Sequence, residues 1–225
     1  MDLKNRLLSA SIMCADLLNL ERDTRELERL GVDYLHIDIM DGSFVPNLTF
    51  GPDTINALRA RVKLPFDIHL LMNNPRVIIR SINLQAGDIV TIHSECRESI
   101  MENAAFIKQK GALFGIALNP DSVIDDIKRY LPYIDVVLLM LIVPGFAGST
   151  MIHGMMDKVR QTRRYLDDMG YSNIMISVDG SVSAEKAQHM STLGANIFVG
   201  GTAGIFKKDK TLSETIPFFK KHING

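Results

Sequence analysis

Short apolar runs alternate with longer amphipathic segments along the whole chain. Eight runs have the length and composition of buried strands, at 7–13, 34–40, 66–71, 89–93, 113–118, 136–141, 174–178 and 197–200. The segments after them carry apolar residues at helical spacing, at 17–30, 54–61, 77–85, 99–110, 123–130, 155–169, 184–193 and 212–221. For the first of these helices, Asp16 is the expected N-cap and Gly31 the expected end.

This alternation predicts a single (β/α)8 TIM barrel domain over residues 1–225. Divided among eight strand–helix units, the chain leaves about 28 residues for each unit, which is typical of that fold. No linker or low-complexity stretch interrupts the units. An open, doubly wound sheet is the alternative, but the G-x-G-x-x-G pattern expected after its first strand is absent.

The composition excludes some classes of function but does not indicate a particular one. The chain is 46% hydrophobic and 23% charged, with a formal net charge of −1 and no basic run, so nucleic acid is not an expected partner. No apolar run reaches membrane-spanning length, and the first residues lack a signal-peptide layout, so we expect a cytoplasmic protein without membrane contact. Cys14 and Cys96 are too few for a disulfide framework.

Polar side chains gather where the predicted strands end. His36 and Asp38 are two residues apart and therefore share a strand face, His69 lies near the end of 66–71, and Asp179 follows 174–178. The C-terminal strand ends of a TIM barrel form its active face, so these side chains are expected to meet. Further polar residues at strand ends are Asp41, His93 and Asn119.

A set of two histidines and two carboxylates can bind a divalent metal, and the carboxylates can also move protons. Taken singly, a strand-end histidine is more often structural, and Asp179 before a glycine can simply open a turn. The convergence of His36, Asp38, His69 and Asp179 on one rim favours the metal site.

Three glycine-rich loops predict a phosphate site. They follow the last three strands, at 143–149, 179–181 and 200–204. Glycine lets backbone amides approach an anion closely, and phosphate sites in such barrels commonly use the loops after strands seven and eight. A phosphorylated small molecule is therefore the expected ligand.

Several motifs together resemble the ribulose-phosphate 3-epimerase family over nearly the whole chain. The long stretch LHIDIMDGSFVPNLTFGP at 35–52 is the most specific, and the other matches are SASIMCAD at 9–16, DIHLLMNNP at 67–75, ALNP at 117–120, PGFAG at 144–148 and VDGS at 178–181. The resemblance implies inversion of C3 of a ketose phosphate through a 2,3-enediolate, with one acid–base group on each face of that carbon.

The resemblance also implies roles for individual residues. Asp38 and Asp179 would be the acid–base pair, and the metal ligands would be His36, Asp38, His69 and Asp179. Zinc is the first choice for the ion, and manganese, iron(II), cobalt or magnesium remain open. The residues expected to contact substrate are Ser9, Met40, His69, Met72, Met140, Gly145, Gly148, Gly180, Ser181, Gly201 and Thr202. A homo-oligomer is also expected.

Departures from the family's usual pattern bear on the length of the sugar. Ser43 replaces a histidine, residues 141–143 replace a more polar stretch, and Ser181 replaces a second glycine. Ala147, Ser181 and the run 201–206 are more similar to the allulose-6-phosphate 3-epimerase branch, so D-allulose 6-phosphate, interconverted with D-fructose 6-phosphate, is the favoured substrate. D-ribulose 5-phosphate, interconverted with D-xylulose 5-phosphate, is the alternative.

Two other classes stay open. A decarboxylase or aldolase barrel would share the glycine loops, but it would need a lysine in 35–42 or within a strand, and none is present. A sugar-phosphate-binding barrel without turnover is the non-enzymatic alternative, and the intact set of proposed ligands argues against it.

Overall fold

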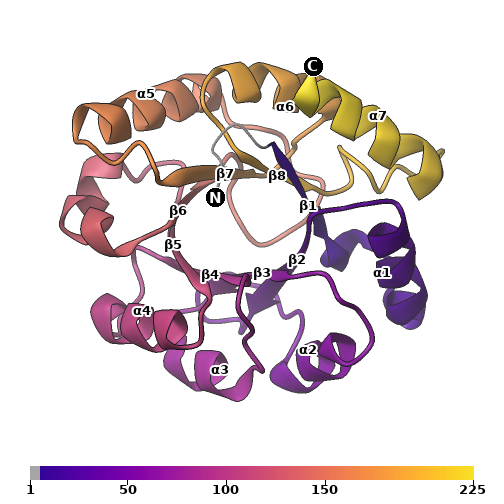
Figure 1. Cartoon of the computed structure of the whole chain (residues 1–225), viewed down its shortest axis with the longest axis horizontal. Coiled ribbons are helices and arrows are strands. Elements are labelled where there is room, and N and C mark those ends of the chain that lie inside the picture. Colours follow the sequence, from indigo (N-terminus) through magenta and orange to yellow (C-terminus); the bar gives the residue numbers. More distant parts are fainter. Residues whose placement is uncertain (1–5) are drawn as a thin grey trace.

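Eight parallel strands, hydrogen-bonded in chain order, close into a barrel in the computed structural model, which describes residues 6–225. β8 pairs with β1 to complete the ring, and the predicted (β/α)8 barrel is confirmed (Figure 1). The strands are β1 Leu7–Ser11, β2 Tyr34–Met40, β3 Phe66–Leu71, β4 Ile89–His93, β5 Leu113–Leu118, β6 Val136–Met140, β7 Met175–Asp179 and β8 Ile197–Gly200.

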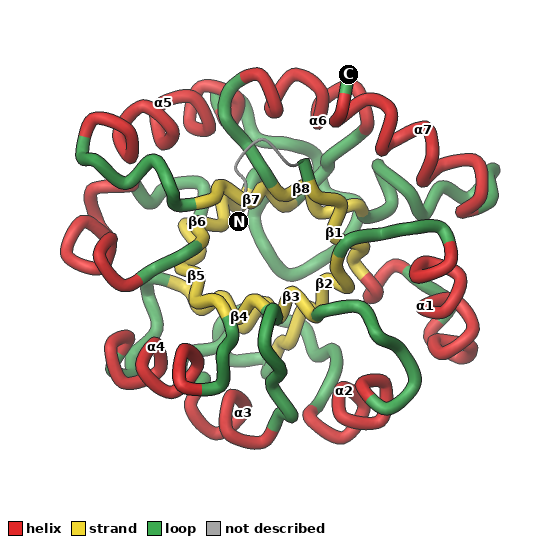
Figure 2. The backbone as a smooth tube through the Cα atoms, in the orientation of Figure 1, coloured by secondary structure: helices red, strands yellow, loops and turns green. Residues whose placement is uncertain are grey.

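Helices surround the ring of strands on the outside (Figure 2). The α-helices are α1 Leu20–Arg29, α2 Pro52–Arg59, α3 Arg76–Ser81, α4 Ile100–Gln109, α5 Met155–Asp168, α6 Ala184–Thr192 and α7 Leu212–Asn224. The 3₁₀ helices are η1 Ile12–Cys14, η2 Leu17–Asn19 and η3 Ile124–Tyr133. Among residues 6–225, no helix is both long enough and apolar enough to cross a membrane.

The strands are buried on both faces, which explains why they are apolar almost throughout. Outward-facing strand residues such as Ile37 and Ile68 pack with the helices in the main hydrophobic core. Inside the barrel, a separate apolar cluster closes the end where the strands begin, formed by Tyr34, Ile89, Val136, Met175 and Ile197. The polar interior side chains lie above this cluster, so the chemistry is confined to the C-terminal half of the barrel.

Several predicted elements differ from the structure. The segment predicted as one helix at 17–30 is divided into η2 and α1, and the helix predicted at 77–85 ends at Ser81. The segment predicted as a helix at 123–130 is the 3₁₀ helix η3, which contains Pro132. Proline lacks an N–H to donate and disfavours a continuing α-helix. The first strand ends at Ser11 rather than at residue 13, and Asp16 caps η2 by accepting a hydrogen bond from the Leu18 amide.

The loop that joins β6 to α5 crosses the barrel opening (Figure 1). It is held to the loop between β2 and α2, because the Asn47 side-chain amide donates a hydrogen bond of 2.7 Å to the Gly145 carbonyl oxygen. These two loops therefore lie together over the C-terminal ends of the strands.

Candidate active site

Four side chains from three strands meet at the C-terminal end of the barrel. His36 and Asp38 lie on β2, His69 on β3 and Asp179 at the end of β7, and each offers one ligand atom within 4.8 Å of the others. The parallel register places Asp38 directly beside His69. The structure thus brings together the whole set expected from the strand ends.

Asp38 is the centre of this cluster. Its Oδ1 lies 3.1 Å from His36 Nε2 and 3.1 Å from His69 Nδ1. Its Oδ2 accepts a hydrogen bond of 3.2 Å from the Ser11 hydroxyl, which the sequence analysis did not assign to the site. Ser11 shares the inward face of β1 with Ser9, and that spacing is the signal that would have indicated it.

The two carboxyl groups have opposite proton affinities. Burial raises the pKa of Asp179 and the nearby charge of Asp38 raises it further, to about 7. Burial also opposes ionisation of Asp38, but the charge and hydrogen bond of His36 outweigh it and hold the pKa of Asp38 well below its usual range. Burial lowers the pKa of His36, yet the carboxylates of Asp38 and Asp67 bring it well above its usual value. At neutral pH, Asp38 is therefore ionised while Asp179 can carry a proton.

Asp67 is a functional candidate that was not predicted from the sequence. Its Oδ2 lies 2.8 Å from His36 Nδ1 and accepts a hydrogen bond of 2.8 Å from the Ser9 hydroxyl. All three side chains are buried inside the barrel. Asp67 precedes His69 by two residues on β3, so the i, i+2 spacing placed it on the same inward face.

The donor set fits a divalent cation. Imidazole nitrogens and carboxylate oxygens are ligands that zinc, manganese, iron and cobalt accept. Two buried carboxyl groups this close repel each other when both are ionised, as the raised pKa of Asp179 reflects. A bound cation would relieve that repulsion.

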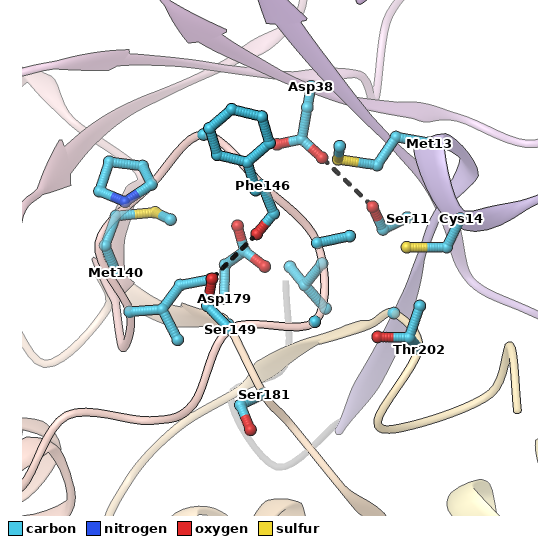
Figure 3. A pocket seen from close by; sticks show the side chains of 18 of the residues that line it. Ser11, Met13, Cys14, Asp38, Met140, Phe146, Ser149, Asp179, Ser181 and Thr202 are labelled. Atoms are coloured by element: carbon cyan, nitrogen blue, oxygen red, sulfur yellow. Dashed lines mark hydrogen bonds between the residues drawn. The ribbon is translucent and has the colours of Figure 1, made fainter. Parts of the chain in front are cut away.

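A cavity of about 280 Å³ opens beside the cluster and extends under the loop after β6. Asp38 and Asp179 both point into it (Figure 3). It is also lined by eight of the residues expected to contact substrate, namely Met40, Met140, Gly145, Gly148, Gly180, Ser181, Gly201 and Thr202.

The other residues expected to contact substrate lie elsewhere. Met72 is buried in the hydrophobic core between strands and helices, and it does not line the cavity. Ser9 lies inside the barrel and donates to Asp67. His69 belongs to the ligand cluster but is fully buried and is not part of the cavity wall.

Comparison with known proteins finds matches over most of the chain. The model of the ribulose-phosphate 3 epimerase family matches residues 7–206. A ribulose-phosphate 3-epimerase of Bacillus subtilis is 35% identical over 209 residues, which cover 92% of this chain and 96% of that protein. One of Escherichia coli strain K12 is 34% identical over 202 residues, covering 89% of each chain.

The chain belongs to the ribulose-phosphate 3-epimerase family. As a member it is an isomerase, an epimerase acting on a carbohydrate phosphate. Its fold is also similar to the solved structures of proteins that carry other names. KGPDC from Streptococcus mutans has a TM-score of 0.69 at 15% identity, covering 97% of this chain and 97% of that one. Orotidine 5'-phosphate decarboxylase from Pyrococcus horikoshii has a TM-score of 0.69 at 13% identity, covering 97% and 100%.

Ser181, one of the departures from the usual epimerase pattern, has an unusual backbone. Within residues 6–225 it is the only non-glycine residue with a positive φ, at 55°. This left-handed conformation favours glycine, which is the residue that the family resemblance leads one to expect at this position. The Ser181 hydroxyl points away from Asp38 and Asp179 (Figure 3). The Lys186 ammonium donates a hydrogen bond of 3.1 Å to it.

The other two departures have local structural roles. The Ser43 hydroxyl donates a hydrogen bond of 2.8 Å to Asp41 in the loop after β2. In the apolar stretch 141–143, Leu141 is fully buried and Ile142 lines the cavity, while Val143 is exposed. Neither departure alters a residue of the ligand cluster.

Proposed function

We propose that this epimerase interconverts D-ribulose 5-phosphate and D-xylulose 5-phosphate by inverting C3. The observation that carries the proposal is the pair of carboxyl groups, Asp38 and Asp179, which line one cavity with pKa values shifted in opposite directions. The names of the relatives support the pentulose phosphate, because relatives at about 35% identity over most of the chain are ribulose-phosphate 3-epimerases. They favour it over the hexulose phosphate expected from Ala147, Ser181 and the run 201–206.

Epimerisation at C3 needs a base on one face of that carbon and an acid on the other. The proton α to the C2 carbonyl is removed, a 2,3-enediolate forms, and a proton returns from the opposite face. Asp38, which is ionised, suits the role of base, and Asp179, which can be protonated near neutral pH, suits the role of acid. In the reverse direction the two exchange roles.

We infer that a divalent ion, with zinc the first choice, is held by His36, Asp38, His69 and Asp179. When bound, it would supply a positive charge that stabilises the negative charge developing on the C2 and C3 oxygens. The Ser11 hydroxyl, which donates to Asp38 Oδ2, fixes the orientation of that carboxylate beside the reacting carbon. Met40 and Met140 offer thioethers that pack against a planar intermediate without protonating it.

The far end of the cavity suits the phosphate. Gly180, Ser181, Gly201 and Thr202 line it on the loops after β7 and β8. A Cβ at Gly180 would meet Ile142 atoms at 2.6 and 2.9 Å, so a side chain at this position would be overpacked. Backbone amides and hydroxyls of these loops would bind the phosphate oxygens and so fix the distance from phosphate to C3.

D-allulose 6-phosphate is the second candidate substrate, because Ser181 alters the loop at the phosphate end. The experiment that decides is a comparison of kcat/KM for ribulose 5-phosphate and allulose 6-phosphate on one purified, metal-loaded preparation, since that ratio measures differential transition-state binding. We expect at least a tenfold preference for ribulose 5-phosphate. A tenfold preference for allulose 6-phosphate would reverse the choice, and no turnover of either sugar would support a binding protein instead.

A further inference from the structure

A buried carboxylate contacts His36 on the ring nitrogen that faces away from the cluster. Its Nδ1 lies 2.8 Å from Asp67 Oδ2, so Nδ1–H donates to Asp67, and Nε2 is the nitrogen whose lone pair would bind a cation in place of a proton. Nε2 is the nitrogen that faces Asp38, at 3.1 Å. The Ser9 hydroxyl donates to the same Oδ2 of Asp67 at 2.8 Å and so helps to orient the carboxylate.

His69 is oriented the other way round. Its Nδ1 faces Asp38 at 3.1 Å, whereas its Nε2 lies 2.9 Å from Nε2 of His93. Two imidazole nitrogens at this distance need one proton between them, because two lone pairs or two N–H groups would repel. For the lone pair of His69 Nδ1 to face the cluster, His69 Nε2 must carry the proton and His93 Nε2 must accept it.

His93 is itself fixed in this orientation. Its ring stacks on that of His69 with centroids 5.0 Å apart, and Phe44 packs on it at 4.5 Å. When His93 Nε2 accepts, its own proton is on Nδ1, which faces Glu95 Oε2 at 3.6 Å. Glu95 Oε1 is held by hydrogen bonds of 2.9 Å from the Asn119 amide and the Ser122 hydroxyl.

We propose that Asp67 and His93 are positioning residues that hold the two histidines of the cluster in complementary tautomers. Asp67 keeps the lone pair of His36 on Nε2, and His93 keeps the lone pair of His69 on Nδ1. His36, His69 and His93 are fully buried, and Asp67 is nearly so, so solvent does not readily replace these partners. The proposal rests on the metal site proposed above, because only a bound cation makes the choice of nitrogen matter.

The test measures metal affinity rather than turnover. Zinc or cobalt dissociation constants are obtained by competition with a chromophoric chelator, for the full-length wild type and for Asp67→Ala and His93→Phe. Outer-shell partners of ligating histidines are typically worth about 10- to 100-fold in metal affinity, and we expect a loss in that range for each variant. Asp67→Asn and His93→Gln keep an acceptor at the same place, and we expect each to recover most of the loss.

Ser177→Ala is the matched control. Ser177 is buried in the same barrel interior, two residues before Asp179, and its hydroxyl has no hydrogen-bond partner. We expect it to bind metal within about threefold of the wild type, well short of the loss typical of an outer-shell partner. Variant affinities equal to that of the control would overturn the positioning role, whereas a wild type that binds no divalent ion would overturn the metal site itself.

A measurement on the wild type keeps the proposal testable if a variant fails to fold. Nitrogen-15 NMR of histidine-labelled, zinc-loaded protein distinguishes a metal-bound Nε2 from a metal-bound Nδ1. One histidine of each kind is the expected result. Two histidines bound through the same type of nitrogen would contradict the assignment of the two tautomers.

Discussion

Asp38 and Asp179 reach the same cavity from β2 and β7, with ligand oxygens that lie within 4.8 Å of each other. Figure 3 shows both carboxyl groups pointing into the space between the strands. Burial raises the pKa of Asp179, and the negative charge of Asp38, which His36 stabilises, raises it further. This difference suits one of the pair to the proposed role of base and the other to the proposed role of acid.

Removal of either carboxyl should remove proton transfer on one face of C3. We expect Asp38→Asn and Asp179→Asn each to lower kcat by about 100-fold or more, because general acid–base groups contribute roughly 10²–10⁴-fold. The measurement is a coupled assay with ribulose 5-phosphate at saturating metal. Ser177→Ala serves as the control and should keep wild-type kcat. A loss below tenfold for either aspartate variant would remove that residue from the proton transfer.

Proton exchange at C3 provides a separate check. In deuterated water, the epimerised product should carry solvent deuterium at C3, since the proton removed by one aspartate is not the one returned by the other. Mass spectrometry or proton NMR of the product reads this directly. Retention of the substrate hydrogen at C3 would mean that the two-base reaction is wrong.

Metal removal should abolish activity reversibly. Dialysis against a strong chelator should reduce turnover to background, and one equivalent of a divalent ion should restore it. Comparison of zinc, manganese, iron(II), cobalt and magnesium then ranks the ions. The metal content of each preparation has to be measured alongside, because full activity of a preparation verified as metal-free would contradict the proposed ligand set.

The barrel could be predicted from the sequence because its strands are short, apolar and regularly spaced. The four proposed ligand residues followed from the same logic, since each stands in or at the end of such a run. The loop 141–154 could not be placed, because nothing in its sequence states that it crosses the barrel opening. The sequence predicts an α-helix in place of η3 because its apolar spacing does not distinguish i+3 from i+4 hydrogen bonding.

The side chains inside the barrel were harder to predict because both faces of each strand are buried. Once His69 is known to point inward, the alternation of side chains along the strand separates inward-facing from outward-facing residues. Asp67 then lies on the inner face with it, whereas Met72 has the parity of Leu70 and packs with it in the outer core. Met40 has the parity of Asp38 and lines the cavity. Alternation was therefore sufficient to find Asp67, and it agrees with the position of Met72 outside the cavity lining.

The contribution of Asp179 to the stability of the metal-free protein should fall as pH rises from about 4 to about 7. The pKa of Asp179 is raised from its usual value of 3.8 to about 7 in the folded protein, so the folded state binds this proton more tightly than the unfolded state. Stability then decreases wherever the folded state binds more protons, and the full penalty is present above pH 7. The shift corresponds to a penalty of at most about 4 kcal/mol.

Asp179→Asn tests this link between charge and stability. Urea unfolding of chelator-treated protein at pH 5 and pH 8 gives the free energy of unfolding for wild type and variant. We expect the free energy of unfolding of the variant, relative to that of the wild type, to rise by about 1 kcal/mol or more from pH 5 to pH 8. The reason is that asparagine carries no charge at either pH. An equal difference at both pH values would show that the Asp179 carboxyl does not titrate as described.

Gly180 is expected to resist even the smallest substitution, because two separate costs fall on it. Its φ of +110° strains any L side chain, and a Cβ would lie 2.6 Å from Ile142 Cγ1. We expect Gly180→Ala to lower the free energy of unfolding by roughly 2–5 kcal/mol, from backbone strain and overpacking together.

Gly170 separates the two costs, since its φ is +81° but a Cβ there would meet nothing within 4 Å. Gly170→Ala should therefore cost only the backbone strain, about 1–3 kcal/mol, and keep wild-type kcat. Adding Ile142→Ala to Gly180→Ala should recover the part of the lost unfolding free energy that comes from overpacking. Urea unfolding of Gly180→Ala, Ile142→Ala and the double variant measures this recovery. Because Gly180 follows Asp179 directly, displacement of this turn also moves the acid, and a 1 Å shift there can cost about 100-fold in turnover. Equal destabilisation by Gly180→Ala and Gly170→Ala, with no recovery in the double variant, would show that the contact with Ile142 does not set the turn that carries Asp179.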